Sequence, residues 1–536
     1  MTDANRDGRP NDDGTAKGRT AQGSAAASGA DLGIRLDRAS AVPLYRQVEA
    51  VIRGRIASGD LPVGARLPPE RKLATALGVD RTTVVAAYRE LAADGLVAAH
   101  VGRGTTVAEP PPGPRRGEPE PRGGVVWDHL LTLRDEEDPI LARVSALTAR
   151  EGVISFAGGA PARETYPIET FRRLVGEALD GDGAGGGLLE YSPPEGLPGL
   201  RDVLAERMGR WGVPVARRNL IVCAGSQQGL YLLARALVEP ADVVAVEAPT
   251  YLGALQVFRA VGARLVAIPA DRDGLDVGRL EDLLARRTVK LIYVLPTFQN
   301  PTGATMSLAR RERLLAVARK HGVAIIEDDP YGDLRYGGEG MPSLLALDHG
   351  RGSPVIYLST FSKVLFPGFR LGWVAAPGAV VERLAWVKAL VDLDTNPLAQ
   401  WAVAEFIRRG DLDAHVASLG GHYRARRDAL LGHLREIAGD RVSVRAPEGG
   451  FYLWVRLQGG VNARGVLAEA EALDVAFVPG EVFFAAGGGR ESLRLAFSAV
   501  PPDQMAEGIR RLVTAIDRAA ERRVTQRRVA PASRIV

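Results

Sequence analysis

The sequence predicts an α/β protein of two units: a small helical unit with a β-hairpin, then a large unit with a mostly parallel central sheet. Three observations lead to this prediction. The proline-rich segment AEPPPGPRRGEPEPRGG, residues 108–124, divides the 536 residues. Before it, apolar residues recur mainly at helical spacing. After it, short β-branched runs alternate with helical patterns, which is typical of a parallel α/β sheet.

Composition narrows the class of protein. The chain is 46% hydrophobic and 25% charged, the balance of a soluble globular protein. Its single cysteine, Cys223, excludes an intramolecular disulfide framework, and the histidines lack metal-ligand spacing, so we expect no metal site. No apolar run is long enough to span a bilayer, and the N-terminus lacks a secretory signal. We therefore expect a cytoplasmic protein without a membrane partner.

Composition also predicts the domain boundaries. Residues 1–39 have little to bury and are expected to be disordered. Residues 40–108 form the small unit, 109–124 a semi-stiff linker, and 125–520 the large unit. Residues 521–536 are a basic tail with five arginines and one glutamate, which either assists nucleic-acid binding or is disordered. Residues 41–108 hold nine basic and six acidic residues, the asymmetry expected when one end of a protein meets nucleic acid.

The small unit is predicted to be a winged helix-turn-helix. A first helix follows Pro43, with an apolar stripe through Val48 and Ile52. A second helix opens at Pro69-Glu70 and ends at Gly78. Asp80 is placed to cap a third helix, residues 81–93. The β-type runs LVAAH and TTVA then flank a Gly-rich tip, residues 101–104.

This order of elements would place the third helix in the major groove of DNA. Its first residues, Arg81, Thr82 and Thr83, would face base edges and phosphates. Arg71 in the second helix and Arg103 in the wing suit phosphates or the minor groove. The alternative is a three-helix docking module whose charges are merely solvated.

Residues 43–107 resemble the winged-helix domain of the GntR family of bacterial repressors over its whole length. Val85 stands where many members carry a further DNA-contacting arginine, so no operator sequence is carried over from those members. The resemblance implies that the partner is double-stranded DNA. It also implies DNA contacts at Arg71, Arg81, Thr82, Thr83, Gly102 and Arg103.

In the large unit, chemically distinctive residues stand where predicted strands end, which is where ligands bind in such sheets. Lys363 follows VIYLST, Asp328 ends VAIIED, and Tyr331 follows three residues later. Pyridoxal 5'-phosphate requires a lysine for a Schiff base, a carboxylate beside its ring nitrogen, an aromatic neighbour and phosphate donors.

Further fragments suit the remaining parts of the cofactor. Asn300 lies in an Asn-Pro-Thr-Gly turn and could reach the ring oxygen, while Tyr251 could stack on the ring. Ser226 and Gln227 begin a helix after a glycine turn, which is a ready phosphate site. Each fragment alone could be structural: an ordinary turn, a helix cap or a surface lysine. Their joint occurrence in this order predicts a cofactor site.

Nearly the whole of residues 125–520 resembles a fold-type I, class I aminotransferase. The resemblance implies that Lys363 forms the Schiff base, that Asp328 pairs with the pyridinium, and that Arg494 binds the substrate carboxylate. Ser359 or Ser362 could replace Thr360, which stands where many members have serine. The remaining implied cofactor residues are Asn300 and Tyr331 at the ring oxygen, Tyr251 at the ring, Ser226, Gln227, Thr360 and Arg370 at the phosphate, and Tyr191 at the neighbouring subunit's phosphate.

Together the two units resemble the MocR family of bacterial transcription regulators. The resemblance implies a regulator that depends on pyridoxal phosphate and forms a head-to-tail homodimer. Its signal would be a small amino compound or the cofactor itself, and its response would be altered DNA binding. The alternative is a genuine aminotransferase with an appended winged helix, since the groups for transamination are all present.

Overall fold

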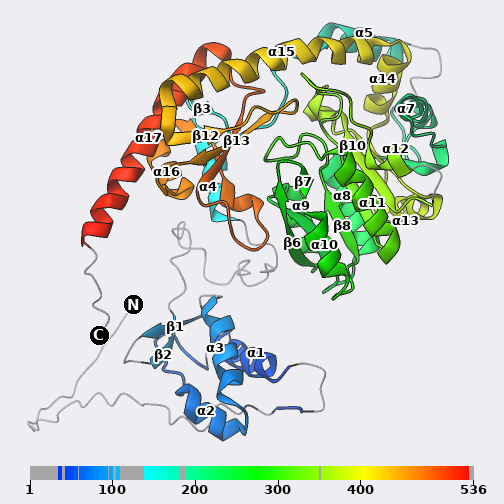
Figure 1. Ribbon diagram of the computed structural model, residues 1–536. Helices are drawn as coiled ribbons and strands as arrows, with labels where there is room; N and C mark the ends of the chain where they lie inside the picture. The colour runs from blue at the N-terminus through cyan, green and yellow to red at the C-terminus, as the bar shows by residue number, and fades with distance from the viewer. Residues whose placement is uncertain are drawn as a thin grey trace, which may run out of the picture. The chain divides into compact units, whose positions relative to one another are not determined.

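The chain forms two compact units, residues 1–131 and 132–536. The computed structural model in Figure 1 describes residues 34, 36–38, 43–57, 60–93, 96–100, 104–108, 138–180, 187–348 and 352–529. The predicted linker, 109–124, and the wing residues Gly102 and Arg103 lie outside these ranges.

The small unit has the elements that the sequence predicts. Its two strands pair antiparallel, with Val97 opposite Val107. The core contains apolar residues from all three helices and the hairpin, among them Val48, Ile52, Leu73 and Leu91. The elements are α1 (Leu44–Ala57), α2 (Glu70–Leu77), α3 (Arg81–Ala93), β1 (Val97–His100) and β2 (Gly104–Val107).

The turn between α2 and α3 forms as its residues predict. Gly78 adopts φ 62°, a left-handed conformation that glycine takes without a Cβ penalty, and its N–H bonds the end of α2. Asp80 Oδ1 accepts a hydrogen bond from Thr82 N at 2.7 Å, which caps α3. These two contacts set the angle at which α3 leaves the turn.

The N-terminal boundary of the small unit lies earlier than residue 40. Ile34 and Leu36 pack against the core of the unit, and Arg38 donates to Gly78 O at 2.7 Å. A few described positions of the segment 1–39, which was expected to be disordered, therefore contact the small unit. No sequence pattern predicts these contacts, because two isolated apolar residues in a polar segment do not form a periodic pattern.

The large unit is built on an eight-stranded sheet in the order β4-β11-β10-β9-β8-β5-β6-β7. Strands β10, β9, β8, β5 and β6 pair in parallel, whereas β11 and β7 are antiparallel to their neighbours. The mostly parallel sheet is thus confirmed. The strands are β4 (Leu220–Cys223), β5 (Val243–Ala248), β6 (Arg264–Asp271), β7 (Gly274–Leu275), β8 (Leu291–Val294), β9 (Ala324–Asp328), β10 (Val355–Thr360) and β11 (Gly372–Ala375).

Helices cover both faces of this sheet (Figure 1). One face packs against α8 (Ser226–Leu237), α9 (Leu252–Ala260) and α13 (Gly378–Ala389). The other packs in a larger core with α7 (Pro198–Arg210), α10 (Val277–Leu284), α11 (Leu308–His321) and α12 (Leu344–Asp348). Helices α5 (Ile168–Asp180) and α14 (Pro397–Arg408) join this second core. Both faces are therefore dry, and the loops at the strand ends are left to form the site.

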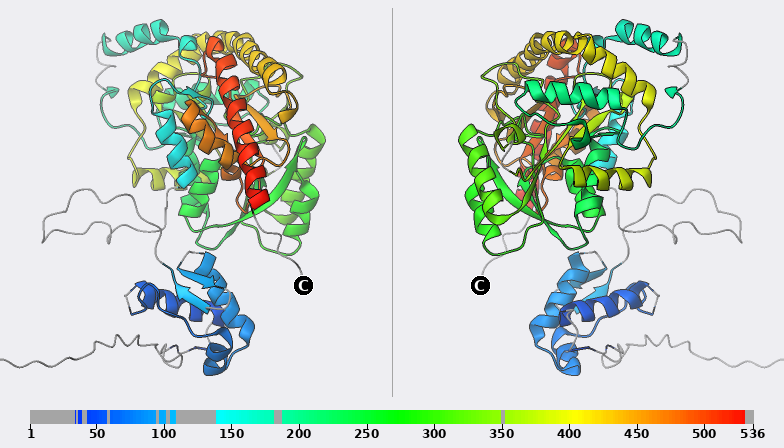
Figure 2. Two further views of the ribbon diagram at one scale, coloured as in Figure 1. Left: turned by 90° about the vertical axis from the view of Figure 1, so that its left-hand side faces the viewer. Right: turned by 90° about the vertical axis from the view of Figure 1, so that its right-hand side faces the viewer.

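A second lobe follows the long helix α15 (Asp411–His433) and contains the antiparallel sheet β12-β13-β16-β15. Figure 2 shows α17 lying across the outside of this lobe. Because α17 continues to Val529, the first nine residues of the predicted basic tail are helical. The other elements are α4 (Pro139–Thr148), β3 (Ile154–Ser155), β12 (Val442–Val444), β13 (Tyr452–Leu457), α16 (Ala463–Ala470), β14 (Val475–Ala476), β15 (Val478–Pro479), β16 (Ser492–Ala496) and α17 (Pro502–Val529).

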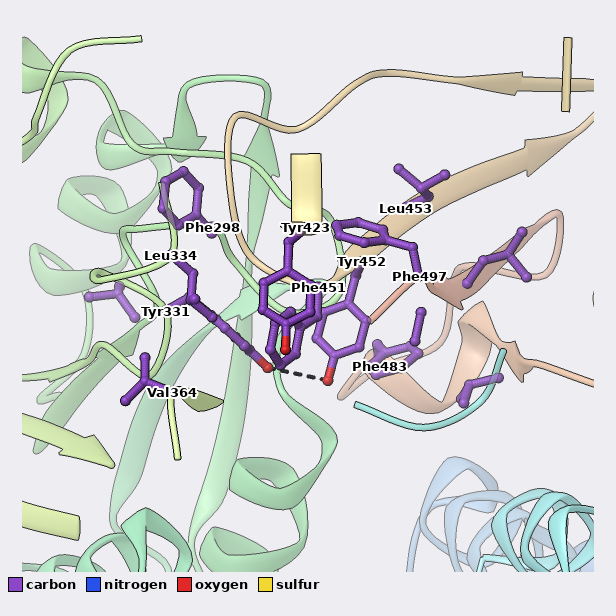
Figure 3. Packing of buried hydrophobic residues seen from close by; sticks show 14 of the residues in the cluster. Phe298, Tyr331, Leu334, Val364, Tyr423, Phe451, Tyr452, Leu453, Phe483 and Phe497 are labelled. Atoms are coloured by element: carbon purple, nitrogen blue, oxygen red, sulfur yellow. Dashed lines mark hydrogen bonds between the residues drawn. The ribbon is translucent and has the colours of Figure 1, made fainter. Parts of the chain in front are cut away.

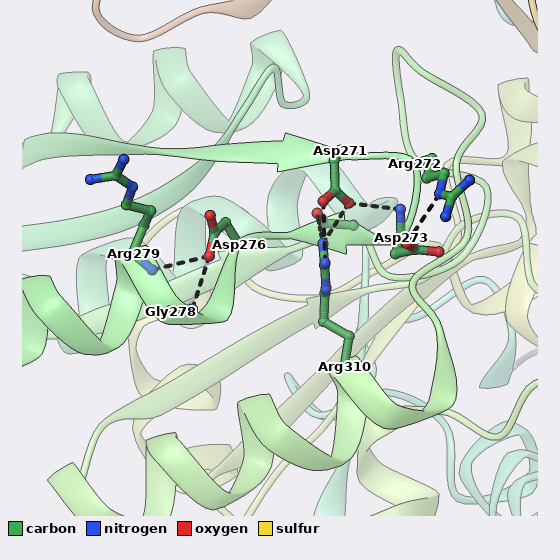
Figure 4. A network of polar contacts seen from close by, with 8 residues as sticks. Asp271, Arg272, Asp273, Asp276, Gly278, Arg279 and Arg310 are labelled. Atoms are coloured by element: carbon green, nitrogen blue, oxygen red, sulfur yellow. Dashed lines mark hydrogen bonds and ion pairs between the residues drawn. The ribbon is translucent and has the colours of Figure 1, made fainter.

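A polar network holds the far edge of the large sheet (Figure 4). Arg310 on α11 donates to Asp271 Oδ1 at 2.5 Å and to Gly274 O at 2.7 Å, across the β6–β7 turn. Asp276 caps α10 by accepting from Gly278 N at 2.9 Å. These bonds hold the β6–β7 hairpin against α11.

Within the described ranges, no helix is both long and apolar enough to cross a membrane. The same ranges hold no group of three or more His, Cys, Asp or Glu residues that could bind a metal ion.

We expect Leu91→Ala to destabilise the small unit by about 3 kcal/mol, because it removes a fully buried side chain and leaves a cavity. Differential scanning calorimetry should show one transition shifted downward and the transition of the large unit unchanged. Val63→Ala, at a side chain that is 56% exposed, is the control and should shift neither. Loss of both transitions together would contradict two independently folded cores.

Candidate functional site

The loops after the parallel strands converge at one edge of the eight-stranded sheet. Strands β10, β9, β8 and β5 are consecutive neighbours with a common direction, so their carboxyl ends lie side by side. Asp328 ends β9, Lys363 follows β10, Asn300 follows β8 and Tyr251 follows β5. The sheet topology thus gathers four predicted site residues that are up to 112 positions apart in the sequence.

Asp328 is a buried carboxylate with one oxygen unsatisfied. Its side chain accepts a hydrogen bond from the Tyr293 hydroxyl at 2.6 Å through Oδ2, while Oδ1 is buried without a partner. Burial raises the pKa of Asp328 to about 7, although the Tyr293 bond acts in the opposite direction. A buried acceptor without a donor lowers the stability of the fold. Oδ1 of Asp328 is therefore a place where a hydrogen-bond donor from a ligand would be favourable.

Lys363 lies at the end of the 3-10 turn 361–363, directly after β10. Its Nζ donates to Gly159 O at 2.9 Å and lies 5.9 Å from the centre of the Tyr331 ring. The ammonium also lowers the pKa of Asp328 through space. The amine and the carboxylate therefore belong to one electrostatic site.

The turn from β4 into α8 lies beside an arginine. Gly225 adopts φ 84°, and α8 begins at Ser226. Arg370 Nη2 donates to Ala224 O at 3.3 Å, and a Cβ at position 225 would lie 2.7 Å from the same nitrogen. At this φ any other side chain would be strained, and its Cβ would displace the guanidinium from the turn. A helix N-terminus beside an arginine is a favourable environment for an anion.

Two hydroxyls adjoin Lys363, and they differ in their bonding. Thr360 Oγ1 lies 2.9 Å from Leu371 O and 3.0 Å from Ser362 Oγ, with a geometry in which Thr360 can donate to either. Because Thr360 has one hydroxyl proton and the Leu371 carbonyl can only accept it, the contact between Thr360 and Ser362 can be made by the Ser362 proton. Nearby, the Tyr251 hydroxyl donates to Gln227 Oε1 at 3.0 Å, and burial raises the pKa of Tyr251 to about 12.

Arg494 enters the site from β16 of the second lobe. Its Nη1 donates to Asn300 Oδ1 at 2.9 Å and its Nη2 to Ala157 O at 2.7 Å. Its Nε is buried without a partner. The guanidinium lies 4.1 Å over the ring of Tyr452, which fixes its plane.

Three residues of this site escape sequence reasoning. The Tyr452 ring packs against the Arg494 guanidinium. The Tyr452 hydroxyl accepts a hydrogen bond from the Tyr331 hydroxyl at 3.2 Å (Figure 3). Tyr293 bonds Asp328, and Gly159 accepts from Lys363. Tyr452 and Tyr293 sit within apolar strands, where an aromatic residue usually signals core packing, and Gly159 acts only through its backbone.

Tyr191 is not part of this site within one chain. Its side chain is 83% exposed, the largest exposure among the large apolar residues of the described chain. Any role at a cofactor phosphate would have to be in a second copy of the chain.

In the small unit, the residues of α2 and α3 that are predicted to contact DNA are at the surface. Arg71, Arg81 and Thr82 are exposed, and Thr83 is half-buried. Arg81 pairs with Glu70, with Nη2 and Oε2 2.8 Å apart, and the Thr82 hydroxyl donates to Asp80 at 2.6 Å. These pairings hold the start of α3 in a defined arrangement.

The fold and the residues gathered at its sheet edge define a class: a DNA-binding helix-turn-helix unit joined to an enzyme-type α/β unit. The chain belongs to the aminotransferase class I and II family, whose model matches residues 151–512. Residues 44–107 match the model of the bacterial regulatory proteins of the gntR family.

Relatives of two kinds are similar to this chain. The aromatic-amino-acid aminotransferase 1 of Thermococcus litoralis is 42% identical over 69% of this chain and 89% of its own length. The uncharacterized HTH-type regulator YisV of Bacillus subtilis is 32% identical over 88% and 96%, and the probable rhizopine catabolism regulatory protein MocR of Rhizobium meliloti 31% over 90% and 95%. The crystal structure of a multiple substrate aminotransferase from Thermococcus profundus has a TM-score of 0.70 at 37% identity, covering 74% of this chain and all of that one.

The similar regulators span both units, whereas the similar aminotransferases match only the second. The protein is therefore a GntR-type transcription regulator fused to an aminotransferase-like domain, as the MocR-type resemblance predicted. Its helix-turn-helix implies DNA binding. The aminotransferase family depends on pyridoxal phosphate, so the family implies this cofactor.

We expect Asp328→Asn to alter how stability depends on pH in the cofactor-free protein. Since the folded-state pKa is raised, the carboxyl's contribution to stability is present at low pH and is lost as pH rises through about 7. Asparagine does not titrate, so the variant should gain up to about 3 kcal/mol over the wild type between pH 5 and pH 8. Urea unfolding at both pH values measures this. The exposed control Asp282→Asn should follow the wild type. If the free energy of unfolding of Asp328→Asn also changes with pH as in the wild type, the prediction is contradicted.

Proposed function

We propose that this protein binds pyridoxal phosphate at Lys363 and changes its DNA binding when an amino compound reaches the same site. The observation that carries the proposal is the buried, unsatisfied Oδ1 of Asp328, in the same electrostatic site as the Lys363 amine. A protonated pyridine nitrogen is the donor that this oxygen lacks. Its positive charge would also keep the carboxylate ionised despite burial.

The other residues fit the remaining parts of the cofactor. The phosphate would bind at the start of α8, at Ser226 and Gln227, with Arg370 beside it. Ser362 would turn its hydroxyl proton toward the phosphate, while Thr360 would orient Ser362 and the backbone of the turn. Tyr251 would stack on the ring, and Asn300 and Tyr331 would reach its phenolic oxygen.

When bound, pyridoxal phosphate supplies an aldehyde that reacts with primary amines and a ring that withdraws electrons. Lys363 would hold the cofactor and be displaced by the effector's amine. Arg494 would bind an effector carboxylate through its paired nitrogens, which now bond Asn300 and Ala157. Tyr452 would hold the guanidinium of Arg494 in one orientation and keep water away from the face that its ring covers.

The regulator would act as a homodimer in a head-to-tail arrangement. Four large apolar side chains are more than half exposed: Leu189, Tyr191, Leu390 and Leu393. Exposed apolar surface is unfavourable in water, and burial against a second copy of the chain would remove it. In that dimer Tyr191 would reach the partner's phosphate. An effector that binds two dimer arrangements unequally would alter the spacing of the two winged helices, and such coupling is typically worth about 1–3 kcal/mol. If the cofactor itself is the signal, adding it without an amine would suffice to change DNA binding.

Transamination is the second candidate function. Arg494, with its partners, is the specific observation that favours it, because a preformed carboxylate clamp also serves an amino-acid substrate. A steady-state assay with 2-oxo acids as acceptors separates the two: fast multiple turnover indicates an enzyme, and a stalled half-reaction indicates a sensor.

We expect Lys363→Ala to abolish the long-wavelength absorbance of the cofactor-loaded protein, because the covalent amine is lost. Borohydride reduction followed by peptide mass spectrometry should find an adduct at position 363 in the wild type and none in the variant. Lys320→Ala, at an exposed lysine paired with Glu281, is the control and should keep both signals. An adduct at another lysine in the wild type would overturn the assignment.

We expect Arg81→Ala to weaken specific DNA binding about ten- to a hundredfold, since one bidentate base contact is worth about 1–3 kcal/mol. Fluorescence anisotropy at one fixed salt concentration, with operator and scrambled duplexes, measures the loss. Cofactor capture at Lys363 should be unchanged. An equal loss on both duplexes would show that Arg81 contacts phosphate and does not read bases.

A further inference from the structure

Lys388 is a fully buried lysine in α13, away from the residues assigned above. Its side chain has no exposed surface. Among the described residues, the charged group that pairs with it is Asp392, whose Oδ1 lies 3.3 Å from Nζ without hydrogen-bond geometry. A buried ammonium requires a nearby carboxylate, so Lys388 holds Asp392 against the body of the large unit.

Asp392, held in place by Lys388, bonds in turn to Gln228 in the first turn of α8. Gln228 Nε2 donates to Asp392 Oδ2. A carboxylate can only accept, so this bond fixes which end of the amide faces Asp392. The opposite end, Oε1, accepts from Ala224 N at 2.7 Å. Asp392 thus sets the orientation of the Gln228 amide, and this orientation points Oε1 at the Ala224 N–H.

Ala224 belongs to the turn proposed to bind phosphate. Its N–H is held by Gln228 and its carbonyl accepts from Arg370 Nη2 at 3.3 Å. Both polar groups of this peptide residue are therefore fixed from outside the turn. The next residue, Gly225, is at φ 84°, where the backbone has no side chain to restrain it.

We propose that Lys388, Asp392 and Gln228 form a positioning relay that holds the turn 224–226 in the shape that binds the cofactor phosphate. The proposal rests on the proposed function, since it requires that pyridoxal phosphate binds here. None of the three residues contacts the cofactor. They act through Ala224 and Arg370, and their contribution is specific to the phosphate.

A pair of ligands tests this specificity: pyridoxal phosphate, and pyridoxal, which lacks the phosphate but keeps the aldehyde. Gln228→Ala and Asp392→Asn should each raise the dissociation constant for pyridoxal phosphate about tenfold, while that for pyridoxal should change less than twofold. Absorbance titration of the full-length protein measures both constants. Gln504→Ala, at an exposed glutamine of α17, is the matched control and should change neither.

The double variant Gln228→Ala/Asp392→Asn identifies the relay itself. If Asp392 acts through Gln228, the double variant should lose no more affinity than Gln228→Ala alone, whereas independent effects would multiply. Thermal unfolding of the cofactor-free variants monitors general damage.

Three results would overturn the proposal. Unchanged affinity for pyridoxal phosphate in both single variants, with a wild type that binds it at Lys363, would refute the relay and leave the proposed function intact. Equal losses for both ligands would indicate general damage and not phosphate positioning. A wild type that forms no adduct at Lys363 would refute the proposed function, and the relay with it.

Discussion

The large unit depends on one costly interaction, the burial of the Asp328 carboxylate at the end of a central strand. The neighbouring strands exclude water from this carboxylate. Among the described residues, the Tyr293 hydroxyl and the Lys363 ammonium stabilise its ionised form. A hydrophobic side chain would stabilise the fold better at this position. The unpartnered Oδ1 could accept a hydrogen bond from a cationic donor, and this is the physical reason for proposing a cofactor site at the edge of the sheet.

The second lobe completes the site instead of merely flanking it. Arg494 and Tyr452 lie on adjacent strands of the four-stranded sheet, yet their side chains meet Asn300 and Tyr331 from the first lobe. Arg494 therefore bonds residues outside its own sheet, and a ligand that took up its donors would break the bond to Asn300. Under the proposed function, that exchange is the local event that would shift one lobe against the other.

Local structure could be predicted from the sequence, and so could several of the residues that gather at the edge of the sheet. The caps at Gly78 and Asp80, the strand ends at Asp328 and the lysine after β10 depend on neighbours within a few residues. What could not be predicted depends on contacts with distant residues. Ile34 and Leu36 join the small core only because a three-dimensional surface needs covering, and no periodic pattern marks them.

By itself, the sequence determined the two-unit organisation, the elements of each unit and the chemical groups available for a cofactor and for DNA, because these follow from local propensity and motif spacing. Only the tertiary structure decided how those groups are bonded. It paired Tyr293 with Asp328, placed Tyr452 under Arg494, and linked Lys388 to the turn before α8. These partners lie on separate elements, and the strand order that joins them arises only when both faces of the sheet are buried together.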